Sequence, residues 1–180
     1  MVGSGDSFEQ RNVNNKVDRA DQSMINYLQS RNFVANKELN ELTDTQQGSY
    51  AKTGFDPKTN YLPRYWEYVD LWEIPDYIIV PKLTHKIFFS EVKGTNKFKL
   101  SDFEGITYLF NQVNELKSKN KNNNRTIEVG VFFFLTREDQ PTKYLDYYSL
   151  KAMWDSIEKL QSYPEKDKDG NTKHYKELII

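Results

Sequence analysis

The sequence contains no cysteine, and this absence excludes disulfide-stapled scaffolds, thiolate zinc sites and cysteine nucleophiles. No apolar run approaches the roughly 20 residues that a membrane-spanning helix needs. The first residues, MVGSGDSFEQ, lack the apolar core of a signal peptide. We therefore expect a soluble cytoplasmic protein that has no membrane partner.

An excess of charge of one sign is also missing, because 25 lysines and arginines nearly balance 26 aspartates and glutamates. Nucleic-acid binding would therefore need a local basic patch rather than a general basic field. Hydrophobic residues make up only 37% of the 180 residues, but they include 12 Tyr, 11 Phe and 3 Trp. Large rings bury much area per residue, so the length and composition still predict one domain with a packed core.

Hydrophobic periodicity predicts an α/β fold with a mixed sheet. Residues 101–104 read as a capping box, with a serine followed three residues later by a glutamate, at the start of a helix. The other predicted helices cover residues 16–32 and 149–160. Strands are predicted at residues 65–72, 77–80, 87–92 and 126–135, with a short closing strand near 175–180.

Three charged residues stand at the ends of two neighbouring predicted strands. Asp76 opens the strand at 77–80, while Glu91 and Lys93 close the strand that follows. Positions i and i+2 of a strand share a face, so Glu91 and Lys93 point the same way, and a hairpin would bring Asp76 beside them. Carboxylate oxygens without thiolate or imidazole suit Mg²⁺ or Mn²⁺, which would serve hydrolysis of a phosphodiester.

The pattern Pro75-Asp76 followed by Glu91-Val92-Lys93 resembles the signature of the PD-(D/E)xK nuclease superfamily. This superfamily includes type II restriction endonucleases, Holliday-junction resolvases and many phage and repair nucleases. The resemblance implies a restriction-endonuclease-like αβββαβ core, in which a central mixed sheet is flanked by helices. It also implies a Mg²⁺- or Mn²⁺-dependent deoxyribonuclease with Asp76 and Glu91 as metal ligands and Lys93 as the catalytic lysine.

The resemblance covers residues 16–135, within a single domain predicted at 16–180 after a flexible segment at 1–15. Residues 35–64 and 136–180 would be additions to the core. The Asn- and Lys-rich composition is typical of an AT-rich genome, such as that of a phage.

Two further site residues follow from the resemblance. The superfamily often places an acid on its first helix as an additional metal ligand; Asp21 is the best candidate, with Asp18 and Glu9 as alternatives. Some members carry a polar residue on the helix after the Glu-x-Lys strand, and Gln112 fits that place. Both could instead be ordinary surface residues, and Glu73 could assist the metal or be a loop carboxylate.

Contacts with the substrate are predicted on both sides of the motif. Lys97 and Lys99 directly follow the site and would meet phosphates, while Arg64 and Tyr65 precede it and would stack on bases. A second basic loop lies at residues 117–125. Solvated lysines and core packing of the rings are the competing interpretations.

DNA is the expected substrate, although RNA is not excluded. Related viral cap-snatching endonucleases usually place a histidine before the PD motif, and the two histidines here, His85 and His174, lie after it. A restriction-type or resolvase-like endonuclease would fit the size, and a homodimer would allow both strands to be cut. The alternatives are a non-catalytic nucleic-acid- or protein-binding module on the same fold, and an unrelated α/β domain in which Asp76 and Lys93 never meet.

Overall fold

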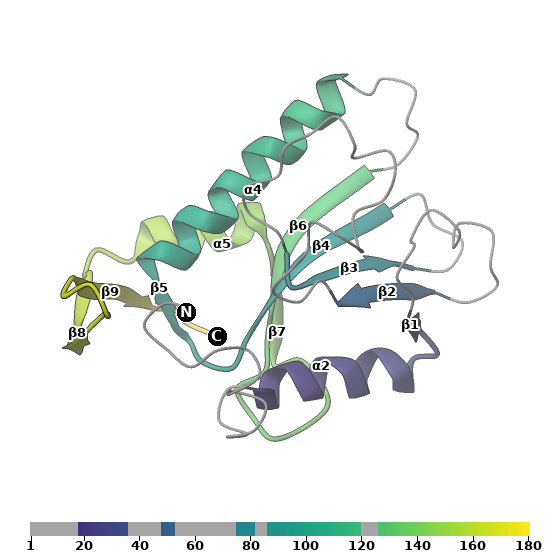
Figure 1. Ribbon diagram of the computed structural model, residues 1–180, viewed down its shortest axis with the longest axis horizontal. Helices are drawn as coiled ribbons and strands as arrows, with labels where there is room; N and C mark the ends of the chain where they lie inside the picture. The colour runs from purple at the N-terminus through teal and green to yellow at the C-terminus, as the bar shows by residue number, and fades with distance from the viewer. Residues whose placement is uncertain (1–17, 36–47, 53–74, 82–85, 120–125) are drawn as a thin grey trace.

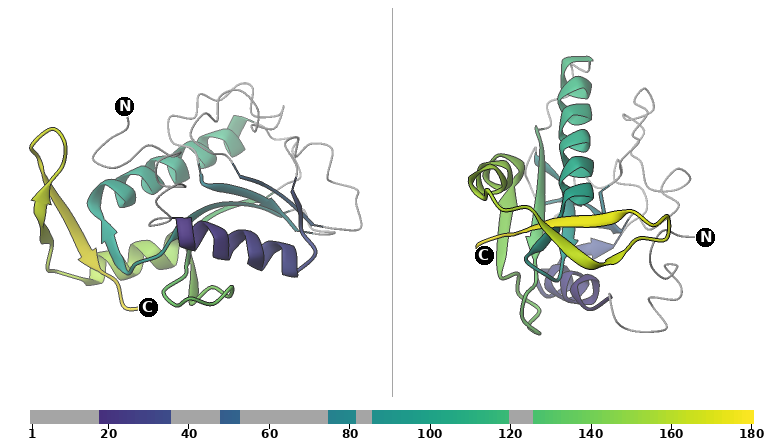
Figure 2. Two further views of the ribbon diagram at one scale, coloured as in Figure 1. Left: turned by 60° about the horizontal axis from the view of Figure 1, so that its bottom comes forward. Right: turned by 90° about the vertical axis from the view of Figure 1, so that its left-hand side faces the viewer.

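A computed structural model describes residues 18–35, 48–52, 75–81, 86–119 and 126–180. These residues form a mixed α/β fold built on a six-stranded sheet, with a separate three-stranded sheet beside it (Figure 1). Figure 2 shows helices α2 and α4 on opposite sides of the large sheet. The α/β class with a central mixed sheet is therefore as the periodicity predicts.

The large sheet has the strand order β1-β2-β3-β4-β6-β7. Strands β3 and β4 pair antiparallel, β4 and β6 pair parallel, and β6 and β7 pair antiparallel. In chain order these strands are β1 (Val34–Ala35), β2 (Ser49–Lys52), β3 (Tyr77–Val80), β4 (Lys86–Lys93), β6 (Thr126–Phe133) and β7 (Lys143–Asp146).

The small sheet has the order β5-β9-β8, and all its pairs are antiparallel. Its strands are β5 (Lys97–Lys99), β8 (Gln161–Lys166) and β9 (Thr172–Glu177). The helices are α2 (Asp18–Ser30), α4 (Leu100–Lys119) and α5 (Tyr147–Ser156). Helix α4 forms the crossover between the parallel strands β4 and β6, and it follows β5 without a break.

Two apolar cores sandwich the central strands. Alternate residues of β4 point to opposite faces, so Ile87 and Phe89 join the core under α4 and α5, while Phe88 and Val92 pack on the α2 side. Burial on both faces explains why β3 and β4 read as nearly continuous apolar runs. Glu91 and Lys93 continue the row of Ile87 and Phe89 on the face under α4.

Several predicted elements are confirmed, with shifted ends. The strands expected at 77–80, 87–92 and 126–135 are β3, β4 and β6, and the first helix is α2. Helix α4 begins at Leu100, so Ser101 lies inside its first turn and the predicted cap position is wrong. Helix α5 begins at Tyr147, because the Asp146 carboxylate caps it by accepting the Ser149 N–H.

Other parts of the layout differ from the prediction. Strand β2 lies within residues 35–64, the segment expected to be an irregular addition, yet it pairs with β3 inside the large sheet. The closing strand is β9, which ends at Glu177 and pairs with β8, a strand that periodicity did not indicate. The strand expected at 65–72 and the segment 1–15 lie outside the described residues. Within the described segments, no helix is long and apolar enough to cross a membrane.

Candidate active site

The β3–β4 hairpin places Asp76 opposite Glu91. Tyr77 pairs with Ser90 in this antiparallel ladder, so the next pair outward is Asp76 with Glu91. Directly opposite side chains lie on the same face of a sheet, and here that face also carries buried Ile78 and Phe89. The Asp76 carboxylate accepts the Val92 N–H at 2.9 Å, which fixes it against the end of β4.

Lys93 lies two residues after Glu91 and therefore points to the same face. Its Nζ is 3.0 Å from Oδ2 of Asp102, which lies in the first turn of α4. The same Nζ is 5.9 Å from the centroid of the Phe98 ring. The structure thus gathers four charged residues, Asp76, Glu91, Lys93 and Asp102, which we call the charged cluster.

A small cavity of about 70 Å³ opens at the charged cluster. Its polar wall is formed by Glu91, Lys93, Ser101 and Asp102. Its apolar wall is formed by Phe98, Gly105, Ile106 and Leu109, which come from β5 and α4. Because the space accommodates a few waters rather than a whole nucleotide, a large substrate would meet the cluster from outside.

Burial and neighbouring charges shift the pKa values of two members of the cluster. Burial raises the pKa of the Glu91 carboxyl well above its ordinary value, and the Asp76 carboxylate, to which it is hydrogen-bonded, raises it further. Burial alone would lower the pKa of Lys93, but the carboxylates of Asp102, Glu91 and Asp76 outweigh burial and raise it. Lys93 is therefore held as a cation, while Glu91 tends to keep its proton.

The residues present fit a divalent cation with hard-ligand preferences. Within the described residues, no three carboxylate, imidazole or thiol side chains gather as a ready-made metal site. Mg²⁺ commonly takes one or two protein carboxylates and fills its other positions with water and phosphate oxygens. Asp76 and Glu91 supply such a pair, and a cation there would replace the proton that Glu91 tends to keep.

Asp21 lies on α2, on the other side of the hairpin from the cluster. The Tyr77 hydroxyl donates to the Asp21 backbone carbonyl at 3.4 Å, and Tyr77 points away from Asp76 because the two are consecutive in the strand. Burial, followed by the charges of Asp21 and Asp76, raises the pKa of Tyr77. The role of Asp21 as a metal ligand stays a prediction. The side chains of Asp18, Glu9 and Glu73 lie outside the described residues.

The other predicted site residues are dispersed. Gln112 lies one turn beyond Leu109 on α4 and is only 8% exposed, so the interpretation as a surface glutamine is wrong. It is not part of the cavity wall. Lys97 and Lys99 lie on β5, exposed and half-buried respectively. Arg64 and Tyr65 lie outside the described residues.

Asp102 is the member of the cluster that the sequence did not reveal. The local pattern of residues 101–104 indicates only a capping box, although the acid at position 102 follows the Glu-x-Lys strand by less than ten residues. An acid in the first turn of a helix is also stabilised by the helix dipole. The position of Asp102 is therefore explained locally, and the sequence gives no reason to expect a contact with Lys93. Only the packing of α4 against the end of β4 brings Asp102 to Lys93.

Comparison of the chain with protein-family models, with curated proteins and with solved structures finds no match. The charged cluster itself is therefore the basis for assigning a function. For the alternative of an unrelated domain, this geometry disagrees only with the premise that Asp76 and Lys93 never meet. Asp76 is bonded to the backbone of Val92, next to Lys93, and its charge raises the pKa of Lys93.

Proposed function

We propose that this protein is a metal-dependent nuclease of the PD-(D/E)xK superfamily that hydrolyses phosphodiester bonds of DNA. The observation that carries the proposal is the pairing of Asp76 with Glu91 across the end of the β3–β4 hairpin, with Lys93 on the same face. Two carboxylates and an ammonium group then lie on one face at this end of the hairpin, and Glu91 and Lys93 also line the small cavity. This is the donor set that a Mg²⁺ or Mn²⁺ phosphodiesterase requires.

The order of elements supports the same proposal. With the two-residue strand β1 and strand β5 of the small sheet left aside, helix α2, strands β2, β3 and β4, helix α4 and strand β6 have the order α, β, β, β, α, β. Strands β2, β3 and β4 form an antiparallel meander, and β6 then pairs parallel to β4. A restriction-endonuclease-like core has this order, and the charged cluster lies where its second strand begins and its third strand ends.

Each residue of the cluster has a chemical role in this proposal. Asp76 and Glu91 would hold the divalent cation, after Glu91 gives up its proton. When bound, the ion supplies positive charge for the phosphate oxygens and lowers the pKa of a coordinated water. Lys93 stabilises the negative charge that develops on the phosphate as water adds and the ester oxygen leaves. Asp102 holds the Lys93 ammonium group in place through their 3.0 Å ion pair.

Nicking of supercoiled plasmid in Mg²⁺ or Mn²⁺ tests the proposal. We expect wild type to nick, EDTA to stop it, and Asp76→Ala and Lys93→Ala each to lose at least about 100-fold in rate. Lys151→Ala is the matched control, because Lys151 is an exposed lysine on α5 that pairs with Asp155 across one helical turn. This variant should nick like wild type.

Tests on other nucleic acids distinguish a nuclease of different substrate preference from a non-catalytic binding module. If plasmid stays intact, the same preparation is tested on single-stranded DNA, RNA and four-way junctions. Cleavage of RNA alone would change the substrate and keep the metal chemistry. Wild type that cleaves none of them with either metal would contradict the nuclease and favour the non-catalytic binding module. The proposed homodimer is a separate question, which sedimentation would answer.

A further inference from the structure

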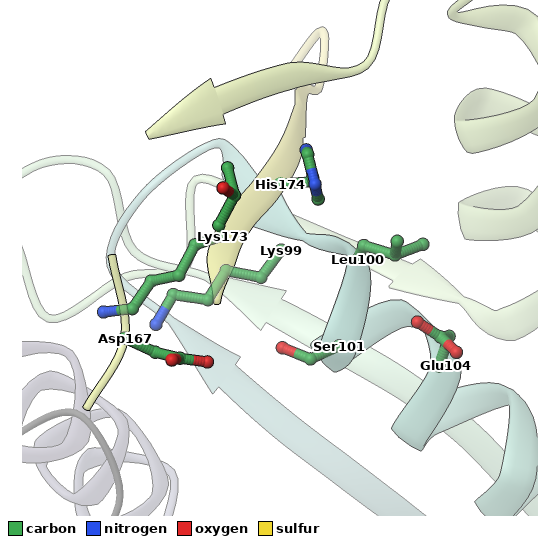
Figure 3. Close-up of a pocket in the computed structure, with 8 residues that line it drawn as sticks. Lys99, Leu100, Ser101, Glu104, Asp167, Lys173 and His174 are labelled. Carbon is green, nitrogen blue, oxygen red and sulfur yellow. The ribbon is translucent and has the colours of Figure 1, made fainter. Parts of the chain in front are cut away.

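A second and larger cavity lies beside the charged cluster. It has a volume of about 270 Å³ and opens between the start of α4 and the β8–β9 hairpin (Figure 3). Ser101 lines both this cavity and the small one at the cluster, so the two adjoin. Its polar lining also includes Lys99, Glu104, Asp167, Lys173 and His174.

Two ammonium groups in this cavity are available to an anion. Lys99 and Lys173 form no ion pair within the part of the chain that the structure describes. The Asp167 carboxylate is engaged in the turn of the hairpin, where one oxygen accepts the N–H groups of Asp169 and Asn171 at 2.9 and 2.8 Å. Figure 3 shows Lys99 and Lys173 extending toward the Asp167 end of the cavity, while Glu104 lies at the other end.

Aromatic rings lie on the same sheet as these lysines. Lys99 pairs with Tyr175 across β5 and β9, so both are on one face, and the ring of Tyr163 on β8 lies 4.4 Å from that of Tyr175. Tyr163 is partly exposed, as a stacking platform must be. Burial first, then Tyr175 and the charge of Asp102, raise the pKa of the Tyr163 hydroxyl, while Lys93 lowers it. Tyr163 is thus within electrostatic reach of the charged cluster.

We propose that the β5–β9–β8 sheet binds a single strand of nucleic acid next to the charged cluster, with Lys99 and Lys173 contacting phosphates and Tyr163 stacking on an unpaired base. Lysines that follow a backbone and rings that stack on bases are the usual means of holding single strands. A base inside a duplex does not offer its face to such a ring. This inference rests on the proposed nuclease function and names its substrate as unpaired nucleic acid.

Fluorescence anisotropy with labelled oligonucleotides tests the inference without cleavage, because Ca²⁺ replaces Mg²⁺. The probes are single-stranded DNA, single-stranded RNA and a DNA duplex, all of one sequence. We expect wild type to bind a single strand more tightly than the duplex. Loss of both lysines in Lys99→Ala/Lys173→Ala should weaken binding at least tenfold and lower the slope of log K against log salt by about 1.4.

The tyrosine is tested in the same assay. Tyr163→Ala should weaken single-strand binding about tenfold without changing the salt slope, and Tyr163→Phe should bind like wild type. Lys151→Ala and Tyr148→Ala are controls, because Lys151 and Tyr148 are exposed residues of α5. Thermal unfolding of every variant separates lost contacts from lost folding.

The outcomes separate this inference from the nuclease proposal. Equal binding of duplex and single strand, or a Lys99/Lys173 variant that is folded and binds like wild type, would overturn the single-strand surface even if wild type cleaves DNA. Binding that depends on Tyr163 and the two lysines, in a protein that cleaves no substrate with any metal, would support the surface and overturn the nuclease.

Discussion

The two halves of one face of β4 differ sharply in chemistry. Ile87 and Phe89 point toward α4 and are completely buried in the core. Glu91 and Lys93 continue the same row, on the same strand and under the same helix, but they carry opposite charges. The neighbouring strand shows what a structural solution would be, because Val131 and Phe133 lie in register with Glu91 and Lys93 and are completely buried. The chain has charges where an apolar core could continue.

This comparison explains the perturbed ionisation of the cluster. Val131 and Phe133 flank Glu91 and Lys93 on the side of β6 and reduce their contact with water. Charges in such a place are costly unless they pair with one another or bind an ion. The charged half of the row is therefore expected to lower the stability of the metal-free protein. The apolar half, Ile87 and Phe89, is expected to raise it.

The largest expected effect comes from the apolar half. Phe89→Ala should lower the free energy of unfolding by about 3–5 kcal/mol, because it opens a cavity in a fully buried position. Urea unfolding followed by circular dichroism measures the loss. Tyr148→Ala, at a residue that is 69% exposed, is the control and should cost much less. Equal losses would mean that the row under α4 is not the core of the protein.

The sequence predicts the elements whose signals are local. Strands β3 and β4 are apolar runs, and the i, i+2 spacing of Glu91 and Lys93 fixes their common face without any structure. Strands β2, β5 and β7, with the sequences SYAK, KFK and KYLD, are short and largely polar or mixed. Such segments become strands because a partner strand lies beside them, and pairing of that kind is not written in the segment itself.

The candidate site is likewise predictable where its signals are local, and not where it depends on the packing of distant segments. Asp76, Glu91 and Lys93 follow from spacing plus a hairpin, which the structure contains. Asp102 does not, because its contact depends on how α4 packs on β4. Nor does the burial of Gln112 follow from the sequence, because a glutamine is typical of a helix surface, whereas the buried side of α4 is wide enough to include position 112.

A loss of stability of intermediate size is expected when the Lys93–Asp102 ion pair of the charged half is broken. Asp102→Asn removes the carboxylate that pairs with Lys93, whose side chain is 23% exposed. We expect the free energy of unfolding to fall by about 1–2 kcal/mol, less than for a fully buried pair, because water still reaches both partners. Relief of the repulsion between Asp102 and Glu91 also reduces the loss.

Urea unfolding at low and high salt checks this expectation. Asp155→Asn is the control, since it breaks the exposed Lys151–Asp155 pair of α5, and its smaller effect should vanish in high salt. The loss in Asp102→Asn should persist there, because partly buried charges are screened less. If both variants respond to salt alike, Lys93 and Asp102 are no more than a surface pair.

The smallest expected effect has the opposite sign. Glu91→Gln keeps the shape of the side chain and removes its charge, so in EDTA it should raise the free energy of unfolding by about 0.5–1 kcal/mol near pH 8. The sign follows from the raised pKa of Glu91. Above the ordinary carboxyl pKa of 4.5 the unfolded chain loses this proton while the folded chain still holds it, so wild-type stability falls as pH rises through the raised value.

The difference between Glu91→Gln and wild type should therefore grow from pH 5 to pH 8, as measured by urea unfolding in EDTA. The neighbouring charges Asp76, Lys93 and Asp102 are present in both proteins, so their own titration largely cancels in the difference. Glu104→Gln is the control, because Glu104 is an exposed acid of the same helix as Asp102. A stability gain that is absent at pH 8, or that shrinks as pH rises, would contradict this prediction. It would mean that a charge on Glu91 costs no stability, so that the charged and apolar halves of β4 do not differ in their effect on folding.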